Sequence, residues 1–575
     1  MSRQYFINMY TIKLFNKQVF RVMALSIIHF SLSISVAQAQ PSWVKKATKS
    51  VFTLKTFAAD GSLVASSNGF FIGQNGEAVG SFSPFKGAVR AIVIDAQGKE
   101  TAVESILGAN DIYDVARFRV ASNKTQPLPL CTTTMTEGSM TWILPYHETK
   151  QLLSGPIRKA EKFLDHYAYY TVAITSPQRM ENCPLLNEQG EVIGLVQPSA
   201  NAQDSLSYAI SVIFADSLRM TGFSMNEPFY QQTQIKKELP DDLKEANIAI
   251  FLASSKNDSL AYARLIDDMI SKFPTSPDGY TYKAQLQTSS GDFASADRNM
   301  NEAIRLSDPK DDAHFNFARL IYAKETYQSD MPFEGWSLDK ALSEIREAIA
   351  ISPLPSYQHL EADILFAQKK YAEASDIYMQ LTQSPMRNAE LFFSAAKCKA
   401  QLRDTTAMLS LLDSCVNTFS KPYFKEAAPY LWERAEARRE AGRYRDAVAD
   451  MNEYEKLMSA NINESFYYIR HQTNIQAHLY QQALNDINQA IKMNPQETLY
   501  YAEKASLEVR VGLFDNAIAT AKECIAVDPN NSDGYLFLGL AQCLKDNKKE
   551  GLDNLRKAKE LGDPQADALI EKYSK

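Results

Sequence analysis

A strict period of 34 residues near the end of the chain constrains the fold more than any other feature of the sequence. Three successive segments superimpose, with tyrosines at one position, small residues at two more, and a proline after two of the segments. The columns are Tyr467, Tyr501 and Tyr535; Ala483, Ala517 and Gly551; Ala490, Cys524 and Ala558; and Pro495 and Pro529. A period of this length predicts a row of similar supersecondary units that stack on their neighbours.

The residue types in these columns predict pairs of antiparallel helices. Small residues are needed where two helices cross closely, and aromatic residues fill the gap between successive pairs. A proline ends the second helix because it lacks an amide donor and clashes with the preceding turn. Less strict copies occur upstream, so we expect about eight or nine hairpins over residues 241–564, an inserted loop at 326–336 and a polar capping helix at 565–575.

This pattern resembles the tetratricopeptide repeat. The resemblance implies a curved all-α superhelical solenoid, in which the first helices of the hairpins line a concave groove that binds a protein or peptide. On this register the expected groove residues are Trp432, Glu436, Arg439, Tyr468, Gln472 and Arg510. Aromatic and arginine side chains are typical of binding hot spots, although a merely solvated helix face would carry similar residues, and the sequence leaves both interpretations open.

Residues 42–225 follow a different pattern, in which short apolar stretches alternate with polar residues and are separated by turns. Asn75-Gly76 and Gln189-Gly190 mark two of these turns. Period-two segments joined by two-residue glycine turns predict antiparallel hairpins. We therefore expect an all-β sandwich or barrel here, followed by a polar linker at 226–240.

Six fragments of this β segment occur in a characteristic order. They are Gly69-Phe70-Phe71-Ile72, Asp114-Val115-Ala116-Arg117-Phe118, Leu128-Pro129-Leu130, Gly155-Pro156-Ile157, Pro184-Leu185-Leu186-Asn187 with Gly190-Glu191-Val192-Ile193-Gly194, and Tyr208-Ala209-Ile210-Ser211. Together they resemble a trypsin-like serine peptidase of the high-temperature-requirement type, over nearly the whole segment. The resemblance implies an all-β double barrel of six strands each.

The positions that align with the catalytic residues of that family argue against catalysis. Ser83 stands where the family has its histidine base, Asp114 is a candidate for the acid, and Glu181 occupies the position of the serine nucleophile. Both glycines that shape the oxyanion hole are also replaced. Since loss of the nucleophile or the base costs on the order of a millionfold in a measured triad, we expect a non-catalytic domain, without metal or cofactor.

An alternative interpretation keeps hydrolase activity through a displaced nucleophile. Cys183 would attack, with His147 or His166 as its base. Cys183 lies two residues beyond the nucleophile position, and a lone cysteine before a proline in a β hairpin is more often buried. The binding interpretation is therefore favoured over the hydrolase.

The first 39 residues predict a secretory signal peptide. Basic residues precede an apolar run at 22–36, and Ala37-Gln38-Ala39 offers a cleavage site. The run is short for a membrane anchor, so we expect a periplasmic or extracellular protein that is not integral to a membrane once processed. An exported chain can form disulfides, but six cysteines without a CxxC pair also suit buried apolar filling.

The charge balance excludes one further class of partner. The formal net charge is −7, and the chain is 45% hydrophobic and 22% charged, which is ordinary globular usage. A nucleic-acid binder needs a basic stripe that neutralises phosphates. We find no such stripe and expect no nucleic-acid partner.

Overall fold

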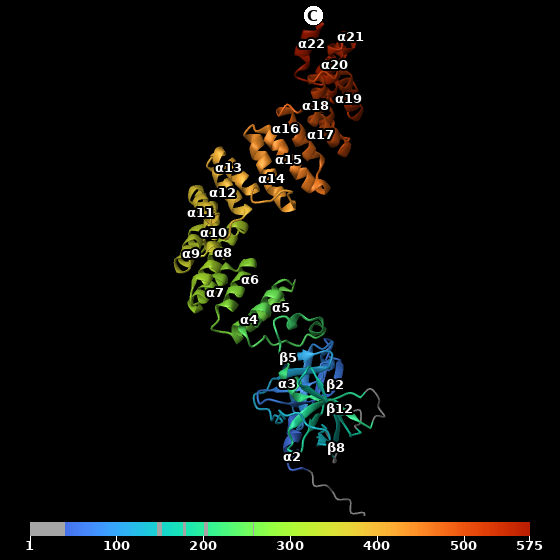
Figure 1. Ribbon diagram of the computed structural model, residues 1–575, viewed down its shortest axis with the longest axis vertical. Coiled ribbons are helices and arrows are strands. Elements are labelled where there is room, and N and C mark those ends of the chain that lie inside the picture. Colours follow the sequence, from blue (N-terminus) through green and yellow to red (C-terminus); the bar gives the residue numbers. More distant parts are fainter. Residues whose placement is uncertain (1–40, 147–151, 176–179, 200–204, 257) are drawn as a thin grey trace, which may run out of the picture. The chain divides into compact units, whose positions relative to one another are not determined.

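The computed structural model describes residues 41–146, 152–175, 180–199, 205–256 and 258–575 (Figure 1). The chain divides into two compact units, Met1–Gly279 and Tyr280–Lys575, and each is considered by itself. The predicted signal peptide lies outside the described residues. Among the residues that are described, no helix has the length and apolar character needed to cross a bilayer.

In the described part of the first unit, twelve strands form two closed antiparallel barrels. The first barrel consists of β1 Val51–Phe57, β2 Leu63–Phe71, β3 Glu77–Gly80, β4 Arg90–Asp95, β5 Glu100–Asn110 and β6 Val115–Val120. The second consists of β7 Met140–Ile143, β8 Leu153–Phe163, β9 Tyr167–Val172, β10 Pro184–Leu186, β11 Val192–Gln197 and β12 Ser207–Ser211. The short helices α2 Val44–Ala47 and α3 Val212–Ser217 flank them.

Both barrels repeat one strand order. The first runs β1-β2-β3-β6-β5-β4, and the second, taken from β7, runs β7-β8-β9-β12-β11-β10. The double barrel that the six fragments predicted is therefore confirmed.

Aromatic packing fills the first barrel because alternate residues of each strand point inward. The ring of Phe52 lies 4.7 Å from that of Phe71 and 6.1 Å from that of Phe118. Gly69 is required beside them, since a Cβ atom there would lie 2.6 Å from the Phe52 ring and 2.7 Å from the Val79 carbonyl oxygen. This close packing explains why a glycine stands at this position of β2.

Residues 226–240 are not the linker that their polar composition predicted, because they pack on the first barrel. The 3-10 helix η4 Pro228–Gln232 follows η3 Ser224–Asn226, and the amide of Ala109 donates to the Tyr230 hydroxyl at 2.7 Å. Lys237 forms a parallel bridge with Ile106 in β5. Of the apolar side chains of the segment, Tyr230, Ile235 and Leu239 are buried and Phe229 is partly buried.

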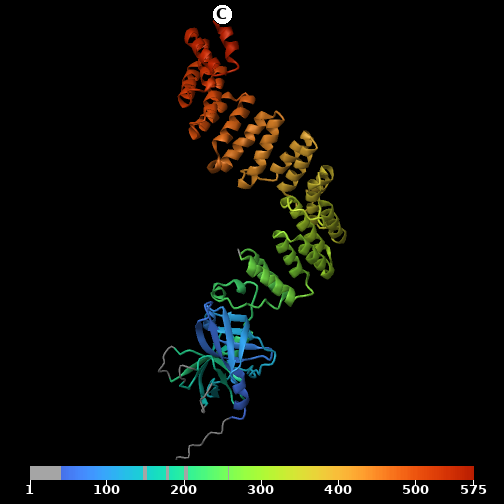
Figure 2. The same cartoon turned by 180° about the vertical axis from the view of Figure 1, so that it is seen from behind.

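From α4 onward, the described chain folds into nine helical hairpins and a last single helix. The helices are α4 Leu243–Ser254, α5 Ser259–Lys272, α6 Pro277–Ser289, α7 Phe293–Leu306, α8 Asp311–Tyr327, α9 Leu338–Ile351, α10 Pro355–Ala367, α11 Tyr371–Leu381, α12 Ala389–Gln401, α13 Thr405–Val416, α14 Ala428–Glu440, α15 Tyr444–Met458, α16 Glu464–Gln476, α17 Tyr480–Met493, α18 Thr498–Arg510, α19 Phe514–Val527, α20 Ser532–Leu544, α21 Lys548–Glu560 and α22 Ala566–Ser574. Within the second unit each hairpin stacks on the next, as Figures 1 and 2 show. The predicted α-solenoid is confirmed, with α22 at the position expected for the cap.

The small residues of the repeat lie where the helices cross. Ala483, Ala517 and Ala490 are fully buried. A Cβ atom at Gly551 would lie 2.4 Å from the sulfur of Cys543, so α20 and α21 approach closely only because this position lacks a side chain. The connection between α8 and α9, residues 328–337, covers most of the predicted loop and buries Trp336 against Phe293.

A polar link that the sequence analysis missed joins the two helices of several hairpins. A side chain on the first helix is hydrogen-bonded to a side chain 12 residues later on the second. The pairs are Gln287–Asn299 at 2.7 Å, Arg438–Asp450 at 2.7 Å, Asn474–Asp486 at 2.8 Å and Gln542–Asn554 at 2.7 Å. Because the residue types change from hairpin to hairpin, this column is invisible to a search for identical residues.

Candidate functional site

The three positions aligned with the catalytic residues meet in the first unit. Ser83 begins the 3-10 helix η2 Ser83–Phe85, Asp114 directly precedes β6, and Glu181 lies just before β10. The backbone amide of Ser83 donates to Asp114 Oδ1 at 2.6 Å. Burial, and then the negative charge of Asp114, raise the pKa of the Glu181 carboxyl. The site therefore holds two carboxylates near one another, and a backbone amide partners the acid where an imidazole is expected.

Asn182, at the first glycine position of the aligned motif, joins the two barrels. Its φ of +66° is a backbone conformation that asparagine tolerates better than most residues. Its side-chain amide donates to Ser67 Oγ at 2.8 Å and accepts from Ser81 Oγ at 2.7 Å. Asn68 adds a third link by donating to the carbonyl oxygen of Glu181 at 3.0 Å. Asn182 therefore links the loop before β10 to Ser67 in β2 and to Ser81 after β3 through side-chain hydrogen bonds.

Cys183 has the wrong environment for a nucleophile. The residue is 1% exposed, and burial raises the pKa of its thiol to about 12, whereas reactive cysteines are partly exposed and have depressed pKa values. His166 lies in the β8–β9 turn, against the ring of Tyr167, and His147 lies outside the described residues. The structure thus speaks against the displaced-nucleophile interpretation.

None of the cysteines is bridged in the described residues, which include all six. Each is a buried free thiol: Cys131, Cys183, Cys398, Cys415, Cys524 and Cys543. Of the two roles that the sequence left open, the structure shows buried apolar filling.

In the array, a cavity of about 510 Å³ opens between the first helices of three successive hairpins. Arg439 comes from α14, Gln472 and Gln476 from α16, and Glu503 from α18, with Tyr444 at the start of α15. Two of the six predicted groove residues, Arg439 and Gln472, therefore line one hollow.

Two more of the predicted residues, Tyr468 and Glu436, contact residues that line this cavity. Gln472 Nε2 donates to the Tyr468 hydroxyl at 2.9 Å, and that hydroxyl donates to Glu503 at 3.4 Å. Glu436 forms an ion pair with Arg439 at 2.6 Å. One carboxylate oxygen of Glu436 and Nε of Arg439 are buried without a hydrogen-bond partner among the described residues. Tyr468 and Glu436 therefore hold side chains that line the cavity.

The other two predicted groove residues lie elsewhere. Trp432 is partly buried in a small apolar cluster, 5.2 Å from the ring of Tyr454 and 5.9 Å from that of Phe466. Arg510 stacks its guanidinium over Tyr480 at 5.3 Å. Neither residue lines the cavity: Trp432 is partly buried in its apolar cluster, and Arg510 is exposed.

Buried ion pairs hold α14 in place behind this cavity. Asp450 accepts from Arg434 Nη2 at 2.7 Å and from Arg438 Nη1 at 2.7 Å. Asp413 contacts the same two arginines at 3.0 and 2.6 Å. The two carboxylates thus neutralise two guanidinium groups that are about nine-tenths buried, and they join α13, α14 and α15.

Comparisons with curated proteins bear on the array. The chain is 30% identical over 95 residues to small glutamine-rich tetratricopeptide repeat-containing protein 2 of Saccharomyces cerevisiae, which is 16% of this chain and 28% of that protein. It is 26% identical over 87 residues to the protein SGT1 homolog of Bos taurus, covering 15% of this chain and 26% of that protein. The chain therefore spans less than a third of the length of these relatives. No protein-family model matches it.

Solved structures similar to the double barrel are peptidases. A protease of M. tuberculosis in its active form aligns with 32% of this chain and 85% of its own, at 17% identity and a TM-score of 0.28. A serine endoprotease of Yersinia pestis aligns with 30% of this chain and 62% of its own, at 16% identity and a TM-score of 0.27. Because these TM-scores are low, the assignment of the fold rests on the strand order of the two barrels and not on these alignments. The helical array thus resembles part of tetratricopeptide-repeat proteins, and the first unit has a trypsin-like double-barrel fold.

Proposed function

We propose that this chain is an exported protein-interaction scaffold, whose array binds a peptide or protein tail and whose double barrel is a non-catalytic relative of peptidases. The observation that carries the proposal is the pairing of Asp114 with the backbone amide of Ser83. A serine peptidase uses that carboxylate to orient a histidine. Here the same carboxylate fixes a turn of backbone, while a second carboxylate, Glu181, occupies the nucleophile position.

The chemistry of the cavity on the array supports binding. Gln472 and Gln476 lie one turn apart on α16, and a side-chain amide can donate to and accept from the backbone of an extended peptide. Arg439 adds a positive charge, and Glu440 and Glu503 add negative charges. A polar cavity formed by three rigid helices suits a peptide segment with hydrogen-bonding side chains better than an apolar ligand.

A peptide-selection experiment tests the binding half of the proposal. The full chain is panned against a random peptide library, and the Kd of the selected peptides is measured by fluorescence anisotropy. Arg439→Ala combined with Gln472→Ala should weaken binding about tenfold or more, since hot-spot truncations cost over 1 kcal/mol. Arg510→Ala is the matched control, because it removes an arginine that stacks on Tyr480 outside the cavity. Equal losses in both variants would refute this placement of the groove.

Export is tested by the amino terminus of the protein isolated from its native cells. Sequencing should find Gln40 as the first residue, in an envelope or extracellular fraction. A chain that retains residues 1–39 in the cytosol would contradict the export proposal.

A further inference from the structure

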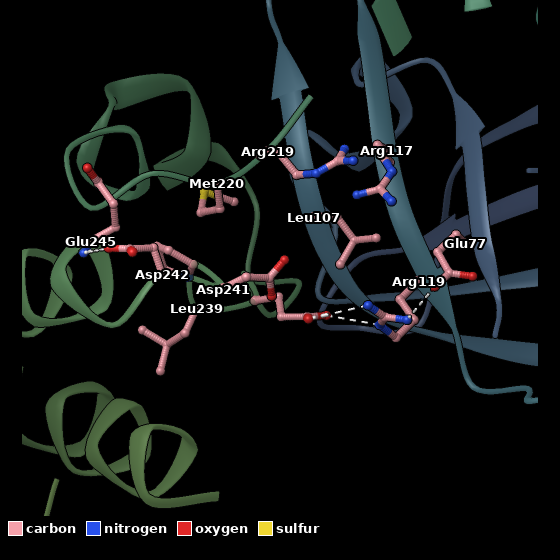
Figure 3. A pocket seen from close by; sticks show the side chains of 12 residues that line it. Glu77, Leu107, Arg117, Arg119, Arg219, Met220, Leu239, Asp241, Asp242 and Glu245 are labelled. Atoms are coloured by element: carbon pink, nitrogen blue, oxygen red, sulfur yellow. Dashed lines mark hydrogen bonds and ion pairs between the residues drawn. The ribbon is translucent and has the colours of Figure 1, made fainter. Parts of the chain in front are cut away.

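A second cavity, of about 430 Å³, lies within the first unit, between the first barrel and residues 219–245 (Figure 3). Leu107 and Met220 provide apolar walls, and three arginines from β6 and the segment after α3 line it. The arginines are Arg117, Arg119 and Arg219. Small-molecule sites are typically hollows of about 300–1,000 Å³ with a few convergent polar groups. Binding of an anion here therefore depends on which of the three arginines the protein has already neutralised with its own carboxylates.

Arg119 is fully engaged. It contacts Glu77 at 3.1 Å and Glu238 at 3.0 Å, and these pairings, with Glu238 as the largest stabilising contribution, raise the pKa of its guanidinium. Because both carboxylates bind it from opposite sides, Arg119 serves as a structural tie between the barrel and the segment that follows it. Its positive charge is already neutralised by these two carboxylates, so it does not attract an anionic ligand.

The acidic residues of the wall are also occupied. Asp241 forms an ion pair with Lys272 at 2.6 Å. Asp242 caps α4 by accepting from the amides of Lys244 and Glu245. Glu245 in turn accepts from the amide of Gly222 at 2.8 Å. These carboxylates therefore have partners of their own, and Asp241 acts on Arg219 only through longer-range attraction.

Arg117 and Arg219 are different, since one carboxylate, that of Asp216, lies beside Arg117, and Arg219 donates to backbone carbonyl oxygens instead. Their guanidinium groups face one another in Figure 3. Arg117 Nε lies 3.4 Å from Asp216 Oδ1 but forms no hydrogen bond within the described residues. Arg219 Nη1 donates to the carbonyl oxygens of Asp216 and Leu218. Burial, and then the neighbouring charge of Arg219, lower the pKa of Arg117, and the charges of Asp216 and Glu77 offset this only in part.

We propose that this cavity binds one small anionic group, a carboxylate or a phosphate, between the guanidinium groups of Arg117 and Arg219. A planar guanidinium offers two parallel N–H donors that match either anion. An anion placed between them supplies the missing negative charge and a partner for the buried Nε. The carboxylates of Asp241 and Asp242 on the same wall repel polyanions, so the ligand carries its negative charge at one end.

The experiment measures binding of sodium acetate and of inorganic phosphate to the full chain by isothermal titration calorimetry at constant ionic strength. At least one of the two should bind saturably at millimolar concentration. Arg219→Gln should weaken that binding tenfold or more, because Arg219 is half of the pair. Stronger binding of acetate assigns the site to carboxylates, and stronger binding of phosphate assigns it to phosphorylated compounds.

Two further variants keep the result decisive if Arg219→Gln perturbs the local fold. Asp216→Asn removes the carboxylate that forms the ion pair with Arg117, so it should tighten anion binding several-fold, a change that unfolding cannot produce. Arg90→Gln, which removes an arginine that stacks on Phe57 in the same barrel, should leave binding unchanged. Failure of both anions to bind, or identical affinities for all the variants, would overturn the proposal. The site is independent of the cavity on the array, so its failure leaves the proposed function untouched.

Discussion

Removal of the Asp450 carboxylate should destabilise the part of the array that carries the groove. Asp450 is 4% exposed and binds two arginines, Arg434 and Arg438, each at 2.7 Å. In an Asp450→Ala variant those two guanidinium groups keep only Asp413, whose side chain is 36% exposed. Breaking a buried ion pair by removing one partner costs about 3–5 kcal/mol. The variant should therefore raise the opening rate of α14 and α15 amides in native-state hydrogen exchange by about a hundredfold or more.

The matched control removes the other carboxylate of the same ion-pair network. Asp413→Ala leaves the buried Asp450 in contact with both arginines, and exposed pairs contribute only about 0–1 kcal/mol. Its effect on the same amides should be less than about tenfold. A triple variant that combines Asp450→Ala with Arg434→Met and Arg438→Leu should recover much of the loss, since hydrophobic side chains often replace buried ion pairs at little cost. Equal effects of the two single variants would refute the assignment of the stabilising role to burial.

Three further predictions concern the double barrel. Burial raises the pKa of the Glu181 carboxyl, so above pH 4.5 the folded protein binds more protons than the unfolded chain, and its stability should fall as pH rises through the raised pKa. Glu181→Gln should therefore raise the thermal midpoint at pH 7 but not at pH 4. An equal effect at both pH values would contradict the shift. Gly69→Ala should destabilise the domain by about 1–3 kcal/mol in chemical denaturation, owing to the clash with Phe52 and Val79; a neutral effect would show that the barrel can relax. Thiol titration should find almost no reactive cysteine in the native protein and all six after denaturation, whereas selective labelling of native Cys183 would revive the hydrolase interpretation.

The helical array could be predicted from the sequence because its constraints are periodic. Small residues at helix crossings and prolines after helices recur at one spacing, so each hairpin supports the assignment of the next. The polar links 12 residues apart escaped because their chemistry varies, from the amides of Gln542 and Asn554 to the ions of Arg438 and Asp450. A search for complementary pairs at a fixed spacing, in place of identical residues, could have found them.

The candidate sites were predicted less completely, for reasons that depend on packing. Composition suggested a linker at 226–240, but burial of Tyr230 and Ile235 against the core of the first barrel decides the structure of that segment. Two of the residues chosen from the repeat register, Arg439 and Gln472, line one cavity. The register failed for Trp432, whose large ring is attracted into a nearby apolar cluster. The anion cavity combines β6 with a segment about 100 residues later, and no local motif signals it.

The most direct test of the central claim is a measurement of peptide retention and peptide cleavage in one experiment. The full chain is incubated with a defined peptide pool, and the retained and released peptides are identified by mass spectrometry. We expect retained peptides to be intact, and retention to be lost in the Arg439→Ala, Gln472→Ala variant. Time-dependent accumulation of cleaved peptides that disappears in a Glu181 or Cys183 variant would contradict the account, because it would show a working catalytic site where the structure places two carboxylates and a buried thiol.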